Sequence, residues 1–163
     1  MSSPRGSEAI AGWRRALGVC GVVVLVDQIS KAIVTSSIAV NHSVSLILGF
    51  KLSNTPNTGL AFGIGQGHGI VLVVTITALA LVLLWFAIDP ARSGLWLAIG
   101  LLAGGALGNL ADRVRVDAVT DFIDPPFWAT FNLADVAITL GAVVLVLSSL
   151  GPERRDEANR GRA

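Results

Sequence analysis

The chain has 163 residues, of which 53% are hydrophobic and 14% are charged, with a formal net charge of +1. Soluble domains usually carry about 25% charged residues, so the composition indicates an integral membrane protein rather than a soluble domain with one core. The small net charge gives no strong attraction to nucleic acid, and the single Cys20 excludes an intramolecular disulfide and fits a small packing residue.

Four apolar segments are each long enough to cross a membrane. They cover approximately residues 13–34, 69–88, 94–111 and 131–150. Roughly 20 helical residues span the hydrocarbon core, and lipid offers the backbone no partners outside the helix. The sequence therefore predicts an all-α membrane protein of four transmembrane helices in a single domain, 1–163, with a disordered charged tail at 151–163.

Positive charges distinguish the two ends of these predicted helices. Eight of the twelve Lys and Arg residues fall on the side of the termini and of the 89–93 connector: Arg5, Arg14, Arg15, Arg92, Arg154, Arg155, Arg160 and Arg162. Because excess positive charge marks the cytoplasmic side, we expect both termini inside the cell. A signal peptide beginning at Arg14-Arg15 is the alternative, but no small-residue cleavage site follows it.

Two longer loops then lie on the outer side. In the first, 35–68, apolar and polar residues alternate over 44–52, which predicts one or two short strands. Residues 54–59 have the composition of a turn, and glycines at 63, 65, 67 and 69 predict a mobile stretch. The second loop, 112–130, contains Pro125-Pro126.

The first helix carries two charges of opposite sign near its outer end. Asp27 and Lys31 are four residues apart and share one helix face. They can form an ion pair that lets the helix end meet water, with Lys31 reaching the interface, or a buried pair that braces a site. Ser30 precedes Lys31, so a catalytic Ser-Lys dyad is a further alternative. Adjacent side chains on a helix point about 100° apart, which argues against it.

Asn57 begins a polar turn, Asn-Thr-Gly, that is followed by apolar residues. An ordinary loop re-entering the interface explains this pattern. The alternative is that the Asn57 amide holds a substrate backbone by hydrogen bonds.

The third helix combines small and polar residues. Gly100, Gly104 and Gly108 recur every four residues and form a smooth strip for helix packing. That strip does not account for Asn109 and Arg113, which also lie four apart on one face. A buried amide and guanidinium need partners, which carboxylates would supply.

Two aspartates lie where the third and fourth helices would surface. Asp135 follows Asn132 by three residues, as in a helix-capping box, and a helix start favours negative charge. Asp121 has no capping role. Its rival, Asp124, precedes Pro125, which suits a turn.

A carboxylate pair provides a chemistry that the rest of the chain lacks. Two nearby carboxyl groups cannot both ionise cheaply, so one keeps the proton. The charged member can then deprotonate a water while the protonated member polarises a carbonyl. His42 and His68 are the only histidines, so the spacing of a zinc site is missing. We expect amide hydrolysis without a metal or another cofactor.

Five blocks, in this order and spacing, resemble the lipoprotein signal peptidase (signal peptidase II) family. They are 27–31 (Asp-Gln-Ile-Ser-Lys), 57–62 (Asn-Thr-Gly-Leu-Ala-Phe), 104–113, 119–122 (Val-Thr-Asp-Phe) and 131–135 (Phe-Asn-Leu-Ala-Asp). The resemblance extends over about residues 13–150. It implies an intramembrane aspartic protease whose catalytic dyad is Asp121 and Asp135.

The resemblance also assigns roles to the surrounding residues. It implies that the dyad is oriented by Asn109, Arg113 and Asn132. Asn57 would contact the substrate backbone, and Asp27 and Lys31 would stabilise the site structurally.

Location and substrate follow from the same resemblance. It implies a multi-pass protein of the bacterial inner membrane, with its site at the outer face and a small extracytoplasmic β-structure in the first outer loop. The substrate would be a prolipoprotein carrying diacylglycerol on a cysteine, cut just before that cysteine. Membrane lipid and the cyclic peptide antibiotic globomycin are further expected partners, and we expect a monomer.

Two other classes of protein remain open. Intramembrane acids also serve as proton relays in small coupled transporters, although Asp27, Asp121 and Asp135 gather at one end rather than at the midplane. The chain would instead be a non-catalytic assembly protein if the glycine strip of the third helix were its docking face.

Overall fold

The computed structural model describes residues 4–59, 68–92 and 94–150. The predictions of a mobile glycine-rich stretch before the second helix and of a disordered tail at 151–163 lie, apart from Gly69, outside these ranges. Within them, the chain forms the helices α1 (Pro4–Ser37), α2 (His68–Ile88), α3 (Leu95–Val116) and α4 (Leu133–Leu150). The strands are β1 (Ser43–Ser45), β2 (Lys51–Asn57) and β3 (Val119–Asp124).

The helices confirm a mostly helical membrane protein. Among the described residues, three segments are long and apolar enough to cross a membrane: Gly6–Ser37, Leu95–Val116 and Leu133–Leu150. The apolar segment of α2, Leu72–Ile88, is shorter. The helices differ from the predicted segments chiefly at their ends, because hydropathy marks only their apolar parts.

The end of α3 is the boundary that matters most. The apolar run predicted an end at Ala111, but the helix continues to Val116. The added residues begin with Asp112, whose carboxylate pairs with Lys31 of α1 at 2.9 Å. Because a partner helix neutralises this charge, the polar turn stays helical instead of opening into a loop.

The three strands form one antiparallel sheet in the order β1-β2-β3. The prediction of strands around 44–52 is confirmed in outline, but the prediction of a turn at 54–59 is wrong for 54–57, because β2 continues through Asn57. The sheet is also not confined to the first outer loop, since β3 comes from the second. Pairing with β3 provides β2 with backbone partners that its own sequence cannot reveal.

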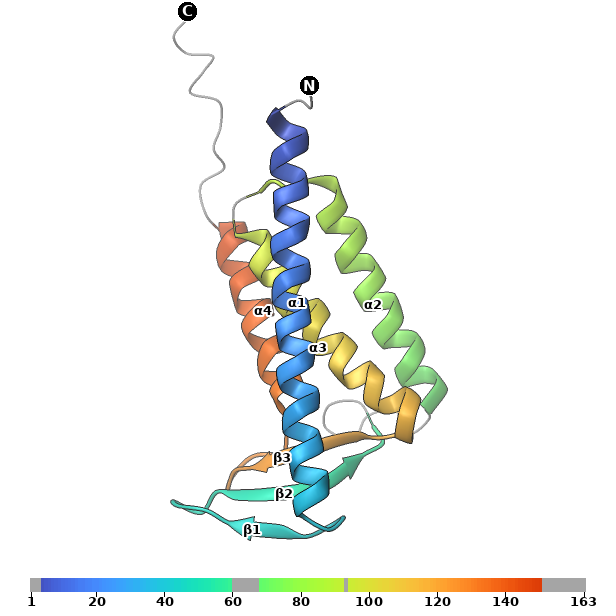
Figure 1. Cartoon of the computed structure of the whole chain (residues 1–163), viewed down its shortest axis with the longest axis vertical. Helices are drawn as coiled ribbons and strands as arrows, with labels where there is room; N and C mark the ends of the chain where they lie inside the picture. Colours follow the sequence, from blue (N-terminus) through green and yellow to red (C-terminus); the bar gives the residue numbers. More distant parts are fainter. Residues whose placement is uncertain (1–3, 60–67, 93, 151–163) are drawn as a thin grey trace, which may run out of the picture.

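The sheet closes one end of the helix bundle (Figure 1). It lies across the end where α1 and α3 finish and α4 begins, while α1 starts and α4 finishes at the opposite end. Val34 and Ile38 at the end of α1 pack against Phe122 of β3 and fix the sheet to the helices.

Helix α3 is the central helix, and its glycines let its neighbours approach closely. A Cβ atom at Gly104 would lie 2.7 Å from the Cβ of Val23 and 3.0 Å from the carbonyl oxygen of Cys20, both on α1. A Cβ at Gly100 would be equally close to Val19. The predicted packing strip is therefore confirmed. Since α1 covers it, the strip is not a free docking face for an assembly partner.

We expect Gly104→Ala to destabilise the protein by about 1–3 kcal/mol, because the new methyl group would overpack the contact with α1. Gly21→Ala is the matched control, since a Cβ at Gly21 meets nothing within 4 Å. Thermal unfolding in detergent measures both variants. Equal melting temperatures for the two would contradict close α1–α3 packing at Gly104.

Candidate active site

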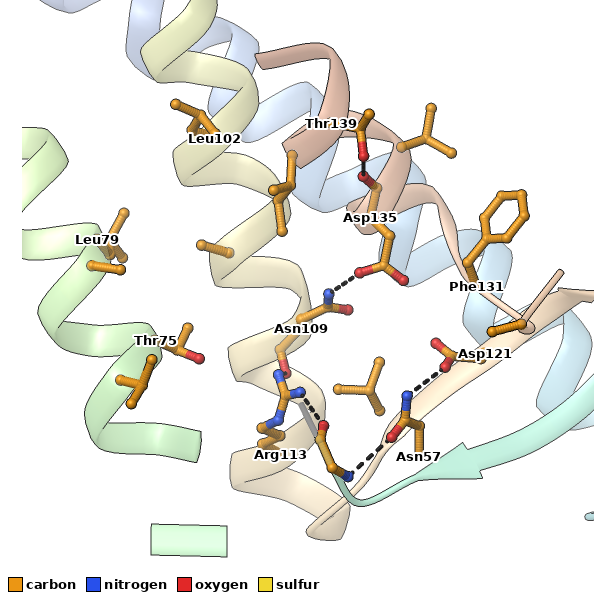
Figure 2. Close-up of a pocket in the computed structure, with 18 of the residues that line it drawn as sticks. Asn57, Thr75, Leu79, Leu102, Asn109, Arg113, Asp121, Phe131, Asp135 and Thr139 are labelled. Carbon is orange, nitrogen blue, oxygen red and sulfur yellow. Dashed lines mark hydrogen bonds between the residues drawn. The ribbon is translucent and has the colours of Figure 1, made fainter. Parts of the chain in front are cut away.

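Asp121 of β3 and Asp135 of α4 face a common pocket of about 810 Å³ (Figure 2). The pocket lies between α2, α3 and α4, and the sheet end of the bundle contributes its polar part. Its opposite wall is largely apolar and includes Val74, Leu79, Val82, Leu102 and Ile138. The charged and amide side chains of the pocket therefore gather at one end of a largely apolar space.

The Asp121 carboxylate is buried and held by two amide groups. Its Oδ1 accepts a hydrogen bond from Asn132 Nδ2 at 2.7 Å, and its Oδ2 accepts one from Asn57 Nδ2 at 2.9 Å. The β2–β3 register brings Asn57 close, because Asp121 lies opposite Thr55 on β2. A sheet contact between two loops therefore aims this carboxylate.

Burial raises the pKa of Asp121 to about 6, and the negative charge of Asp135 raises it too. The hydrogen bonds from Asn57 and Asn132 and the positive charge of Lys31 act in the opposite direction, because they favour the ionised form. The desolvation cost prevails. Asp121 therefore exchanges its proton near pH 6 and can serve as an acid close to neutrality.

Asp135 is held in the first turn of α4. Its Oδ1 accepts a hydrogen bond from Asn109 Nδ2 at 2.8 Å, and its Oδ2 accepts one from the backbone N–H of Asn132 at 3.2 Å. The Asp135 backbone N–H in turn donates to Asn132 Oδ1 at 3.0 Å. This reciprocal pair is the predicted capping box. The capping box therefore also orients the Asp135 carboxylate in the site.

Asn132 connects the two aspartates. It is fully buried, and its side-chain amide also donates to Asn109 Oδ1 at 3.1 Å. All four carboxylate oxygens of the two aspartates therefore accept a hydrogen bond from an asparagine.

Lys31 is buried beneath this network. Its ammonium lies 2.8 Å from Asp27 and 2.9 Å from Asp112, and it donates to Asn109 Oδ1 at 2.9 Å. With only 3% of its surface exposed, Lys31 does not reach the interface, so the buried-pair interpretation holds. The Ser-Lys dyad is excluded, because Ser30 donates to the Asp27 carbonyl oxygen at 2.7 Å and Lys31 is engaged elsewhere.

Asp27 links α1 to the start of α4. Its Oδ1 accepts the backbone N–H of Ala134 at 3.0 Å. The first N–H groups of a helix lack partners within that helix, so this bond satisfies one of them. It places the turn that carries Asp135 against α1.

Sequence reasoning missed Asp112 and Gln28. Asp112 accepts hydrogen bonds from Gln28 at 3.0 Å and from the Thr120 backbone at 3.3 Å, in addition to its ion pair with Lys31. The signal was the three-residue spacing from Asn109 to Asp112, which places both on neighbouring positions of a helix. Among the polar residues of this region, helical spacing was applied only to Asn109 and Arg113.

Arg113 has partners other than the expected carboxylates, and Asn57 holds Asp121. Arg113 donates to the carbonyl oxygens of Gly59 at 3.1 Å and of Asn109 at 3.4 Å. Within the described ranges it forms no ion pair with a carboxylate, so that expectation was wrong, although Arg113 lines the pocket. Asn57 also lines the pocket, but its amide donates to Asp121. Asp124, opposite Lys51 in the sheet, is absent from the pocket lining.

Comparisons with known proteins agree on one family. The family model for signal peptidase (SPase) II matches residues 19–151. The lipoprotein signal peptidase of Nitratidesulfovibrio vulgaris is 38% identical, over 87% of this chain and 94% of that protein. That of Pelotomaculum thermopropionicum is 43% identical, over 81% and 89%. A solved bacterial membrane enzyme shares 30% identity and a TM-score of 0.77, over 83% of this chain and 87% of that one.

We expect Lys31→Met to destabilise the protein by about 3–5 kcal/mol, because it leaves the buried carboxylates of Asp27 and Asp112 uncompensated. Arg115→Met is the control. It removes the second cation paired with Asp112, but the Arg115 side chain is 62% exposed, so the cost should be about 0–1 kcal/mol. Unfolding in detergent measures both, and equal losses would contradict a brace centred on Lys31.

Proposed function

The chain belongs to the signal peptidase II family, and from this premise we propose that it is an intramembrane aspartic endopeptidase acting on prolipoproteins. It would remove the signal peptide from precursors that carry diacylglycerol on a cysteine, cutting just before that cysteine. Its relatives named lipoprotein signal peptidase support this substrate class. The main observation in favour is the pair of carboxylates, Asp121 and Asp135, facing one pocket.

In the proposed mechanism the two aspartates have different protonation states. Asp121 carries the proton, as its raised pKa favours, and Asp135 carries the charge, as the start of α4 favours. Asp135 removes a proton from water, and the water oxygen attacks the scissile carbonyl carbon. Asp121 gives its proton to the carbonyl oxygen. When the C–N bond breaks, Asp135 passes the proton it took from water to the departing nitrogen, and the carbonyl proton returns to Asp121.

The neighbouring residues position these groups. Asn109 and Asn132 hold the carboxylates through their amides, and Arg113 ties the end of α3 to the Gly59 carbonyl. Asp27 and Lys31 brace the helices beneath them. Asn57 orients Asp121, and its position in the pocket lining also leaves it close to a bound substrate backbone.

The pocket suits a substrate that is partly apolar. Its walls come from α2, α3 and α4, and their side chains are mostly aliphatic. A signal-peptide segment and the diacylglycerol chains would gain from leaving water here, while the scissile bond reaches the polar end. We expect globomycin to compete for the same space.

We propose that the protein lies in the bacterial inner membrane as a four-span monomer. The 21 residues of α2, His68–Ile88, carry no Asp, Glu, Lys or Arg and would form the fourth span. Arg92 donates to the Ser148 carbonyl oxygen near the end of α4, and Arg15 lies over the ring of Trp96 at the start of α3. With Arg14, they lie toward the end where α4 finishes and α3 begins, which is opposite the sheet (Figure 1). This asymmetry supports cytoplasmic termini and an active site at the outer face. A proton-coupled transporter is not favoured, because the chain belongs to a peptidase family.

Substitution of either aspartate tests the proposal. We expect Asp121→Asn and Asp135→Asn each to abolish processing of a diacylated precursor by purified protein, because an amide cannot replace a titrating carboxyl group. Asp124→Asn is the matched control and should keep substantial activity, since Asp124 does not line the pocket. Gel-shift assays of precursor cleavage, with circular dichroism to verify folding, measure this.

The substrate class is tested in the same assay with an unlipidated copy of the precursor. Cleavage of the diacylated form alone would support the proposal. Normal processing by either dyad variant, or an equal loss in Asp124→Asn, would reject the assignment of the two aspartates.

The pH dependence tests the role of Asp121 as the acid. We expect kcat/KM to fall as pH rises through about 6, because Asp121 then loses the proton it must donate. Asn57→Ala removes a donor that stabilises the ionised form of Asp121, so the pKa of Asp121 should rise. The decline of kcat/KM should then occur at higher pH. A higher KM with no change in the pH at which kcat/KM declines would show that Asn57 contacts the substrate and does not tune Asp121.

A further inference from the structure

The tip of the β1–β2 hairpin is a tight turn with an unusual residue in it. The Phe50 N–H donates to the Ile47 carbonyl oxygen at 3.1 Å, which closes a four-residue turn. Its two central residues, Leu48 and Gly49, have φ angles of 57° and 81°. Two consecutive positive φ values define a type I′ turn, whose first central position normally holds Asn, Asp or Gly.

Leu48 occupies this position at a cost. A branched aliphatic side chain disfavours the left-handed conformation, because its Cβ crowds the following carbonyl oxygen. Burial could offset such strain, yet Leu48 is 86% exposed and its neighbour Ile47 is 79% exposed. The chain therefore holds an apolar side chain outward, in a strained conformation, without gaining contacts inside the protein. Strain of this kind points to function.

A second apolar group lies beside the tip. A Cβ atom at Gly49 would lie 3.4 Å from the Cβ of Pro126, so the turn touches the loop that follows β3. That loop presents Phe127, which is 96% exposed, and Trp128, which is 67% exposed. The two loops together form one exposed apolar surface, the tip surface: Ile47, Leu48, Phe127 and Trp128.

The place of the tip surface in the fold indicates what covers it. The hairpin extends sideways past the start of α4, at the end of the bundle where the helices stop (Figure 1). Helix α4 exposes Leu140, Val143 and Leu147, as a lipid-facing span does. The tip surface therefore lies at the level where the surrounding lipid changes from acyl chains to headgroups.

The distribution of tryptophan supports the same placement. Trp13 of α1 and Trp96 of α3 pack against one cluster that includes Phe86, the neighbour of Trp85 in α2. The cluster lies where α2 finishes and α3 begins, at the end of the bundle opposite the sheet. Trp128 is the remaining tryptophan of the chain and belongs to the sheet end. Tryptophan favours both membrane–water interfaces, so the four residues mark two interfacial levels.

We propose that the tip surface inserts into the boundary between headgroups and acyl chains of the adjacent lipid leaflet. It anchors the sheet to the bilayer independently of the transmembrane helices. Trp128 also lines the pocket, so the anchor fixes the rim of the pocket at the depth of the lipid surface. This inference extends the proposed function without depending on catalysis.

Site-directed spin labels test the depth of the tip surface. In a Cys20→Ala background, nitroxides are placed by Leu48→Cys and Phe127→Cys in protein reconstituted into phosphatidylethanolamine–phosphatidylglycerol vesicles. Ser45→Cys is the matched control, because Ser45 is exposed on the same hairpin and its side chain alternates with Val44. The collision rate of each nitroxide with oxygen is high in lipid, and its collision rate with a water-soluble nickel chelate is high in water. Their ratio measures the depth of the label.

We expect the oxygen-to-nickel ratio at positions 48 and 127 to exceed that at position 45 severalfold. Equal ratios at the three positions would overturn the anchor, because the tip surface would then lie in water or beneath a protein partner. The measurement needs no cleavage, so its failure is distinct from failure of the proposed peptidase activity.

Leu48→Asn separates anchoring from folding. Asparagine tolerates the left-handed conformation, so the melting temperature in detergent should stay the same or rise. The label at position 127 should at the same time become less accessible to oxygen, because one of the four apolar residues of the tip surface is lost. A lower melting temperature with an unchanged label would assign Leu48 to the fold and overturn its role in the anchor.

Discussion

The buried ammonium of Lys31 joins the helices on which the candidate site depends. It neutralises Asp27 on its own helix and Asp112 on α3, and it fixes the amide of Asn109. An unpaired charge buried among these helices would be costly, so Lys31, Asp27 and Asp112 each depend on their charge partners. Asp27 then binds the backbone at the start of α4, and the arrangement of three helices follows from one charge cluster.

The site lies directly above this cluster and is built from amides. Asn109 accepts a hydrogen bond from Lys31 and donates one to Asp135. The Lys31 ammonium therefore fixes the orientation of the Asn109 amide. Asn132 then joins the two carboxylates. Amide donors orient carboxylates without adding a full charge beside them. Burial can therefore keep the pKa of Asp121 raised to about 6 even though both its oxygens are bonded.

In the proposed placement, the sheet connects this polar network to the bilayer surface. Strand β3 carries Asp121, and β2 carries Asn57, which holds it. The same sheet carries the strained hairpin turn at Leu48. An anchor at the tip and a charge cluster in the helices would therefore fix the site from two sides, one in lipid and one in protein. Such fixation would suit the proposed substrate, in which the lipid tails of the precursor would set the depth of the scissile bond.

The sequence by itself determined the membrane class, the approximate helices and the glycine packing strip, because hydropathy and helical spacing are local properties. The residues that gather around Asp121 and Asp135 were indicated by the five sequence blocks that resemble the signal peptidase II family. Only the tertiary structure decided the rest. It extended α3 through Asp112, since a charge on another helix neutralises that turn. It also drew β3 from the segment between α3 and α4 and gave Arg113 carbonyl partners. Contacts between segments distant in sequence leave no periodic pattern, so only the folded structure shows which residues make them.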